Sequence, residues 1–421
     1  MYEKNSPLHN YLILLALWLM VFSASSQVMI VAPILPRIGE ALAVKQALLG
    51  TLVTSYAVLL SVFALITGPI SDRLGRRAVL LMGSGFMAAA LFLHGLADTY
   101  GSLLAVRALA GAAGGMLSGA AVAYVGDYFP YHRRGWANGW VMSGIAVGQI
   151  IGIPAGTLIA DQFGFRWPFL LFAIVMTLST VMIWRFVPQP DVQRDPHPLS
   201  IRRAIRNYLT LVRDPFVAVG TAVYFLMFFS VGLYVIYLPT WLETTLGVGG
   251  EEIASLFLVG GLASVVAGPA AGRISDSVGR KPLIVFSCAG LGLAMLLTTY
   301  VVTNMWTAYA MFAVSMIMVG MRISPLQSLM SELVTAERRG ILMSLAVGIG
   351  QIGIGISGAV AGFVYSGFGY LSSTFMGASA ILLMAFLVRQ FLPEPDLQPV
   401  AETRLEGAGL DELAAVPETT E

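Results

Sequence analysis

The sequence has little charge and almost no cysteine. Only 11% of its 421 residues are charged, whereas a soluble globular protein carries roughly a quarter. The formal net charge of +1 gives no electrostatic reason to expect a nucleic-acid partner. The single cysteine, Cys288, excludes an intramolecular disulfide and leaves the compartment open. Because 57% of the residues are hydrophobic, the composition indicates a membrane protein surrounded by a lipid bilayer.

Reactive groups are missing from the apolar runs. No carboxylate lies in the middle of any run, and the histidines fall near run ends or in loops: His9, His94, His132 and His197. We find no metal-ligand cluster, phosphate-binding glycine loop or nucleophile-base arrangement. We therefore expect no enzymatic activity, no metal and no cofactor.

Apolar runs of about 20 residues, the length needed to span a bilayer, recur twelve times. A proline- and arginine-rich stretch separates the first six runs from the last six. We expect an all-α membrane protein whose twelve transmembrane helices form two parallel six-helix repeats. The expected parts are an N-terminal half (1–187), a cytoplasmic linker (188–214), a C-terminal half (215–392) and a disordered acidic tail (393–421).

Basic residues are unevenly distributed between the two sides of these runs. Most Lys and Arg residues lie on the side of the termini, whereas Arg37, Lys45 and Arg166 lie on the other. The positive-inside rule then places both termini in the cytoplasm. We expect a multi-pass protein of the plasma membrane, with a bacterial inner membrane as the favoured location.

One charged turn occurs in both halves. The stretch from Gly68 to Arg77 reappears as Gly272 to Lys281, with Gly, Ser-Asp and Gly followed by two basic residues at the same relative positions. A second stretch, Asp127 to Gly135, reappears as Glu332 to Gly340. An even number of spans per half keeps the repeats parallel, which is typical of transporters whose site lies between the halves.

At these residues the chain resembles the major facilitator superfamily over nearly its whole length. The turn from Gly68 to Arg77 is similar to that family's motif A, and Arg107 to its motif B. The twelve-span drug and metabolite efflux group, which contains proton antiporters, is the most similar subgroup. Its helix-five antiporter motif is only partly matched, because Pro154 comes one residue late and Thr157 replaces the last glycine.

The resemblance implies a conformational latch at each charged turn. In the first half, Asp72, Arg76 and Asp127 would form a charge cluster that stabilises the outward-facing state. The alternative is that these charges only set the topology. A matching latch in the second half would use Asp276, Arg280 and Glu332. The glycines that permit the tight turns are Gly68, Gly75, Gly272 and Gly279.

Two arginines fall within apolar runs. A charge in the hydrocarbon zone is costly, so Arg107 and Arg322 are expected to face a partner or a cavity. Arg107 is a candidate for binding an anionic group or assisting proton movement, or else for bonding backbone carbonyls. Arg322 is a candidate for the same pathway, or else snorkels toward the membrane surface. The neutral candidates for the substrate and proton pathway are Gln27, Tyr56, Gln149, Tyr234 and Gln351.

Glycines recur every four residues in the fifth run. Gly144, Gly148, Gly152 and Gly156 therefore share one helix face, with Pro154 beside them. Small residues let helix backbones approach and slide. The alternatives are ordinary tight packing and a specific gating role.

Three functions remain open from the sequence. The first is a monomeric secondary active transporter that works by alternating access and exports a small amphipathic or drug-like compound in exchange for protons. The second is an importer or facilitator of a polar metabolite such as a sugar or organic acid. The third is a non-transporting membrane receptor. The sequence does not identify the substrate.

Overall fold

The computed structural model describes residues 7–190, 201–335 and 338–393, except for the side chains of residues 7, 68, 69, 72, 201–205 and 207. The described residues form helices and no strand, and twelve of the helical segments are long and apolar enough to cross a membrane. The predicted all-α membrane fold is confirmed. Most of the expected tail lies outside the described residues, as do linker residues 191–200.

The N-terminal half, residues 7–186, contains six spans. Three of the spans are broken into shorter helices. In chain order the elements are α1 (Pro7–Met29), α2 (Val31–Ala41), α3 (Gln46–Leu49), α4 (Thr51–Leu74), α5 (Arg76–His94), α6 (Tyr100–Leu117), α7 (Ala120–Tyr128), α8 (Tyr131–Val147), the π-helix η1 (Gly148–Gly152), α9 (Ile153–Phe163) and α10 (Arg166–Phe186).

A short helix in the linker, α11 (Ile201–Val212), precedes the C-terminal half, residues 215–391. The six spans of this half are longer and less interrupted. They comprise α12 (Pro215–Val235) with α13 (Leu238–Leu246), α14 (Gly250–Val278), α15 (Arg280–Val301), α16 (Met305–Glu332), α17 (Arg339–Phe368) and α18 (Tyr370–Phe391).

The breaks in the spans have local causes. Gly119 adopts a positive φ of 74° between α6 and α7, a conformation that glycine reaches without strain. The π-helix η1 ends two residues before Pro154, whose ring nitrogen cannot donate to the preceding turn.

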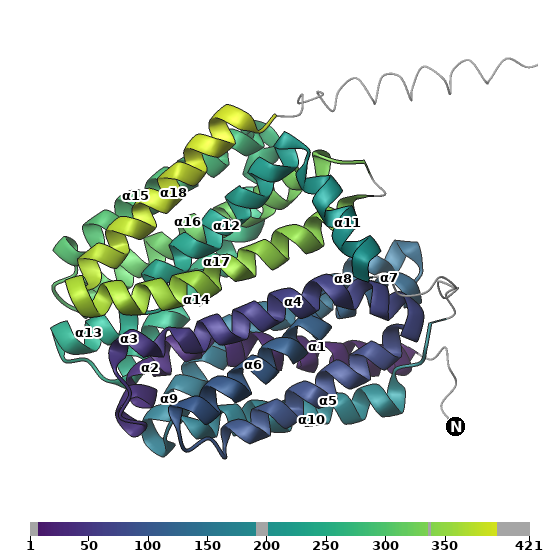
Figure 1. Ribbon diagram of the computed structural model, residues 1–421, viewed down its shortest axis with the longest axis horizontal. Helices are drawn as coiled ribbons and strands as arrows, with labels where there is room; N and C mark the ends of the chain where they lie inside the picture. Colours follow the sequence, from purple (N-terminus) through teal and green to yellow (C-terminus); the bar gives the residue numbers. More distant parts are fainter. Residues whose placement is uncertain (1–6, 191–200, 336–337, 394–421) are drawn as a thin grey trace, which may run out of the picture.

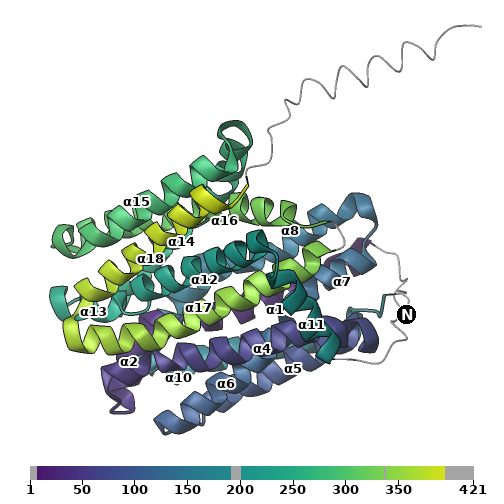
Figure 2. The same ribbon diagram turned by 45° about the horizontal axis from the view of Figure 1, so that its top comes forward.

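The two halves pack against each other along two helix pairs. The helix α4 lies along α17, and α9 with η1 lies along α14. Figures 1 and 2 both show α4 beside α17, with α11 near one end of the pair. We call the end that holds the first residue of α1 the proximal end and the opposite end the distal end. Figure 1 shows α7, α8 and α11 at the proximal end and α2, α3 and α13 at the distal end.

Polar contacts between the halves extend from the distal end to the middle of the spans. The Tyr237 hydroxyl donates to the Gln46 carbonyl at 2.6 Å and accepts from the Gly50 amide at 2.9 Å. Deeper in the bundle, the Ser61 hydroxyl donates to the Gly348 carbonyl at 3.0 Å. The distal end is therefore closed in this structure.

Candidate functional site

Three side chains from different helices form a buried polar cluster in the N-terminal half. Arg107 of α6 donates from Nη1 to Gln27 Oε1 of α1 at 3.0 Å. The amide nitrogen of Gln27 lies 3.1 Å from the hydroxyl of Tyr56 on α4. The Arg107 guanidinium also lies over the Tyr56 ring, 4.6 Å from its centroid, a favourable cation–π geometry. The structure thus brings three of the predicted pathway residues together.

Glycines on α6 make this cluster possible. A Cβ on Gly111 would lie 2.1 Å from the Tyr56 carbonyl oxygen, and one on Gly114 would lie 2.4 Å from the Tyr56 hydroxyl. Because neither glycine has a side chain, α4 approaches α6 closely enough for Tyr56 to reach Gln27 and Arg107. The Nε atom of Arg107 has no hydrogen-bond partner in the described protein, so the cluster keeps one donor for another acceptor.

The second buried arginine is more isolated. Arg322 on α16 is fully buried, and none of its three guanidinium nitrogens has a hydrogen-bond partner among the described residues. An unpaired buried donor on a charged group costs more than about 1–3 kcal/mol. Since the side chain is not exposed, it does not snorkel in this structure. Arg322 therefore needs an acceptor from outside the described chain.

The other predicted pathway residues do not join the Arg107 cluster. The hydroxyl of Tyr234 lies 3.1 Å from that of Thr298 and 3.2 Å from that of Ser315, so Tyr234 faces the interior of the C-terminal half. Gln149 lies in η1, where its backbone packs close to Gly261 of α14. Gln351 lies half-buried on α17.

The charged turns at the proximal end hold ion pairs within each half. Arg76 Nε lies 2.6 Å from Asp127 Oδ2, and Arg76 Nη1 donates to the Ser71 hydroxyl at 2.9 Å. In the second half Arg280 pairs with Glu332. The Arg76–Asp127 pair is formed here while the distal end is closed. The role of either pair as a latch stays a prediction.

Among the other predicted latch residues in the two turns, those with described side chains form no ion pair with a described residue. Gly75 and Gly279 have positive φ of 95° and 98°, so both turns require glycine at this point. Asp276 is exposed and forms no ion pair with a described residue. Gly272 packs near Ser324 of α16. The structure does not describe the surroundings of Gly68 or the Asp72 side chain.

The predicted glycine face of the fifth span packs inside its own half. A Cβ on Gly144, Gly148 or Gly152 would meet the backbone or side chains of α1, at Trp18, Ser25 and Ser26 respectively. Gly156 would meet Ile30, directly after α1. These glycines thus pack tightly against α1 and the residue that follows it, and a gating role for them stays a prediction.

A glycine face on α17 crosses between the halves and was not predicted. A Cβ on Gly358 would lie 2.5 Å from the Gly50 carbonyl oxygen, and one on Gly362 would lie 2.5 Å from that of Ala47. Gly355 similarly approaches Ala57 of α4. The spacing of these glycines, which places them on one helix face, is the sequence signal that would have identified them.

An ion bridge at the distal end was also not predicted. Arg37 on α2 donates to Asp161 Oδ1 of α9 from Nε at 2.9 Å and from Nη2 at 2.6 Å. Its Nη1 lies 3.4 Å from the Glu243 carboxylate on α13 of the other half. Burial alone would lower the pKa of Arg37, but its bond to Asp161 and the nearby carboxylate charges raise that pKa above its ordinary value. The guanidinium therefore stays charged.

Comparison with known proteins supports the same architecture. The family model described as Major Facilitator Superfamily matches residues 17–264 and 220–417. The uncharacterized MFS-type transporter YwfA of Bacillus subtilis (strain 168) is 25% identical over 391 residues, covering 91% of this chain and 93% of that protein. The multidrug resistance protein MdtG of Proteus mirabilis (strain HI4320) is 26% identical over 383 residues, covering 86% and 92%.

Two solved structures show the same fold. A D-xylose-proton symporter superposes with a TM-score of 0.77 at 18% identity, covering 93% of this chain and all of the symporter chain. The human organic anion transporter MFSD10 superposes with a TM-score of 0.68 at 20% identity, covering 90% and 98%. With its twelve spans and a family match over most of its length, the chain is a multi-pass membrane transporter that belongs to the major facilitator superfamily.

Proposed function

We propose that this transporter works by alternating access and exports a small amphipathic compound from the bacterial cytoplasm in exchange for protons. In this proposal the protein acts as a monomer in the inner membrane, and the proximal end with both termini faces the cytoplasm. The likeness to MdtG, a multidrug resistance protein, supports the choice of substrate class.

One observation carries the alternating-access part of the proposal. The halves are bonded to each other at the distal end through Tyr237 and Arg37, whereas the ion pairs Arg76–Asp127 and Arg280–Glu332 at the proximal end stay within their own halves. Such an uneven distribution of contacts is expected of one state of a rocking bundle.

Purified protein in proteoliposomes tests the proposal. We expect an imposed pH gradient to drive uptake of lipophilic test compounds into vesicles whose interior is acidic, and Arg107→Ala to reduce that uptake. Gradient-independent flux would contradict proton exchange. A complete lack of flux across a broad compound panel would favour a non-transporting receptor.

The charge of the interior favours a second candidate, transport of an organic acid. Arg107 and Arg322 are both buried, and no carboxylate is buried among the side chains that the structure describes. A cationic interior attracts anionic substrates and repels lipophilic cations. Thermal stabilisation by small carboxylic acids, with no response to lipophilic cations, would move the assignment from drug efflux to this candidate.

A further inference from the structure

The distal bridge, formed by Arg37, Asp161 and Glu243, joins the two halves through one guanidinium. Arg37 and Asp161 belong to the N-terminal half and Glu243 to the C-terminal half. Only 17% of the Glu243 side-chain surface is exposed to solvent. If the halves part at the distal end, Glu243 must leave Arg37 and become solvated. Its surroundings therefore differ between the closed and open arrangements.

The charges around this bridge do not balance. Asp161 makes two close bonds to Arg37, at 2.9 and 2.6 Å, whereas Glu243 lies farther from the guanidinium, at 3.4 Å, and gains less attraction from it. Glu40 of α2 adds a third negative charge close to both Arg37 and Glu243. Closing the distal end thus brings three carboxylates around one guanidinium and partly dehydrates one of them. Both effects oppose ionised Glu243 in the closed arrangement.

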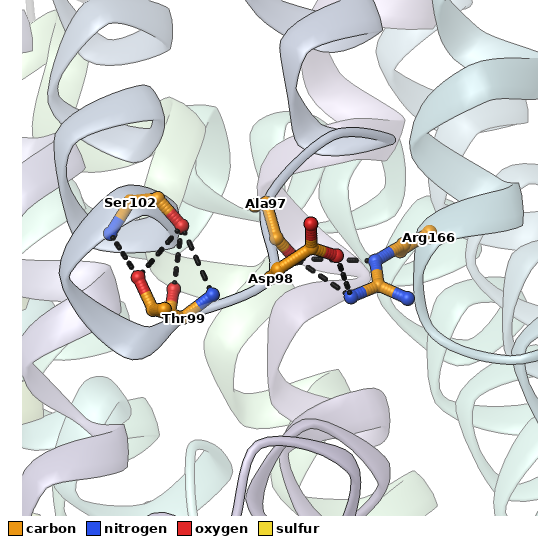
Figure 3. A network of polar contacts seen from close by, with 5 residues as sticks. All are labelled: Ala97, Asp98, Thr99, Ser102 and Arg166. Atoms are coloured by element: carbon orange, nitrogen blue, oxygen red, sulfur yellow. Dashed lines mark hydrogen bonds and ion pairs between the residues drawn. The ribbon is translucent and has the colours of Figure 1, made fainter.

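Other titratable groups on the neighbouring elements do not remove this excess. Lys45 precedes α3 and is exposed, as are Glu251 and Glu252 at the start of α14. Tyr365 of α17 stacks on Tyr237. Arg166, at the start of α10, pairs with Asp98 and bonds the Ala97 carbonyl (Figure 3). That second distal ion pair lies within one half.

We propose that closing of the distal end takes up a proton at the distal bridge, with Glu243 as its acceptor. A proton on Glu243 removes one of the two uncompensated negative charges while Arg37 keeps Asp161. Because the closed arrangement then binds this proton more tightly than the open one, acid favours closing and alkali favours opening. The inference rests on the alternating access proposed above, but it does not depend on the identity of the substrate.

This switch is separate from the Arg107 cluster. It offers a titratable group that changes its surroundings with conformation in a protein whose described interior has no buried carboxylate. The carboxylate reaches the distal solvent when the halves part, so its proton comes from that side.

Spin-label distances across the distal end test the proposal. The single cysteine is first removed as Cys288→Ser, and labels are placed at exposed Leu96 and Thr303, which lie in the distal loops of opposite halves. Between about pH 8 and about pH 5 we expect the ratio of short to long distances to rise about three- to tenfold, within the limit of tenfold per pH unit for one linked proton.

Two variants separate proton uptake from simple attraction across the bridge. Glu243→Gln, which mimics the protonated side chain, should give a high short-distance population that no longer varies with pH. Arg37→Gln leaves the carboxylates uncompensated and should lower that population by roughly tenfold at alkaline pH. If attraction to Arg37 dominated instead, both variants would open the distal end, and that result would overturn the proposal.

The matched control is Asp98→Asn, which breaks the distal ion pair within one half. It should keep the wild-type pH dependence. If both the short and the long distance are observed but the ratio of their populations does not change with pH, proton uptake is rejected and alternating access is retained. A single distance under all conditions and in all variants would reject both.

Discussion

The hydroxyl of Tyr208 on the linker helix α11 donates a hydrogen bond to the Leu65 carbonyl of α4, with 3.2 Å between the oxygens. In a regular helix the amide of residue 69 would bond this carbonyl, but residue 69 is a proline and has no amide hydrogen. The linker therefore supplies a donor that α4 lacks, directly before the first charged turn. Burial raises the pKa of Tyr208, which keeps the hydroxyl protonated as a donor.

Tyr208→Phe should remove this bond and little else. We expect a loss of about 1 kcal/mol in stability, because the Leu65 carbonyl is left without its donor. Thermal unfolding in detergent measures the effect. Thr210→Val, one half-turn further along α11, is the matched control, because its hydroxyl bonds only within the helix, to the Arg206 carbonyl. An equal loss in both variants would show that Tyr208 has no special role.

The contrast between the charged turns and the distal bridge shows which parts of this protein are predictable from sequence. Gly75 and Gly279 are local requirements of a tight turn, so they appear as a repeated motif. The number and positions of the transmembrane helices likewise follow from apolar runs that are long enough to span a membrane. Arg37 and Glu243 are 206 positions apart and meet only when the distal end is closed. No local pattern encodes such a state-dependent contact.

For the same reason, only part of the Arg107 cluster could be predicted from the sequence. The apolar run around Arg107 indicated that its charge needs a partner, but the choice of Gln27 and Tyr56 depends on how α1, α4 and α6 cross. That crossing depends on Gly111 and Gly114, whose contacts are with a helix distant in sequence. Periodicity identifies a helix face made of small residues, but it does not identify the helix that packs against that face.

Arg107→Met should weaken substrate binding while the bundle still folds. The variant keeps an unbranched side chain of similar length but loses the bond to Gln27 and the free Nε donor. A hydrogen bond from a charged group contributes about 1.5–3 kcal/mol, so we expect transport at low substrate concentration to fall about ten- to a hundredfold. Arg389→Gln, an exposed change in the last turn of α18, is the control. Unchanged transport in Arg107→Met would remove this cluster from the substrate pathway.

Arg322→Met should raise stability and reduce transport. Replacing an unpaired buried charge by an apolar side chain removes its desolvation cost, and comparable replacements of buried ionic groups stabilise by about 1–4 kcal/mol. Transport should fall if the missing acceptor is supplied by a substrate during the cycle. The thermal midpoint and vesicle flux are measured on the same preparation. A lower midpoint would indicate that Arg322 has a bound partner in the resting protein, such as an anion.

Gly358→Ala should open the distal end. Its new Cβ would lie 2.5 Å from the Gly50 carbonyl oxygen across the two halves, a distance that forces the backbones apart in the closed arrangement only. Gly353→Ala is the matched control on the same helix, because its Cβ would lie 2.5 Å from the Phe225 carbonyl oxygen within the C-terminal half. With labels at Leu96 and Thr303, we expect Gly358→Ala to shift the population toward long distances by about tenfold or more. Gly353→Ala should lower the thermal midpoint without changing the distance ratio. Because both changes add the same methyl group to α17, a shift in both would trace the effect to general loosening rather than to the contact between the halves.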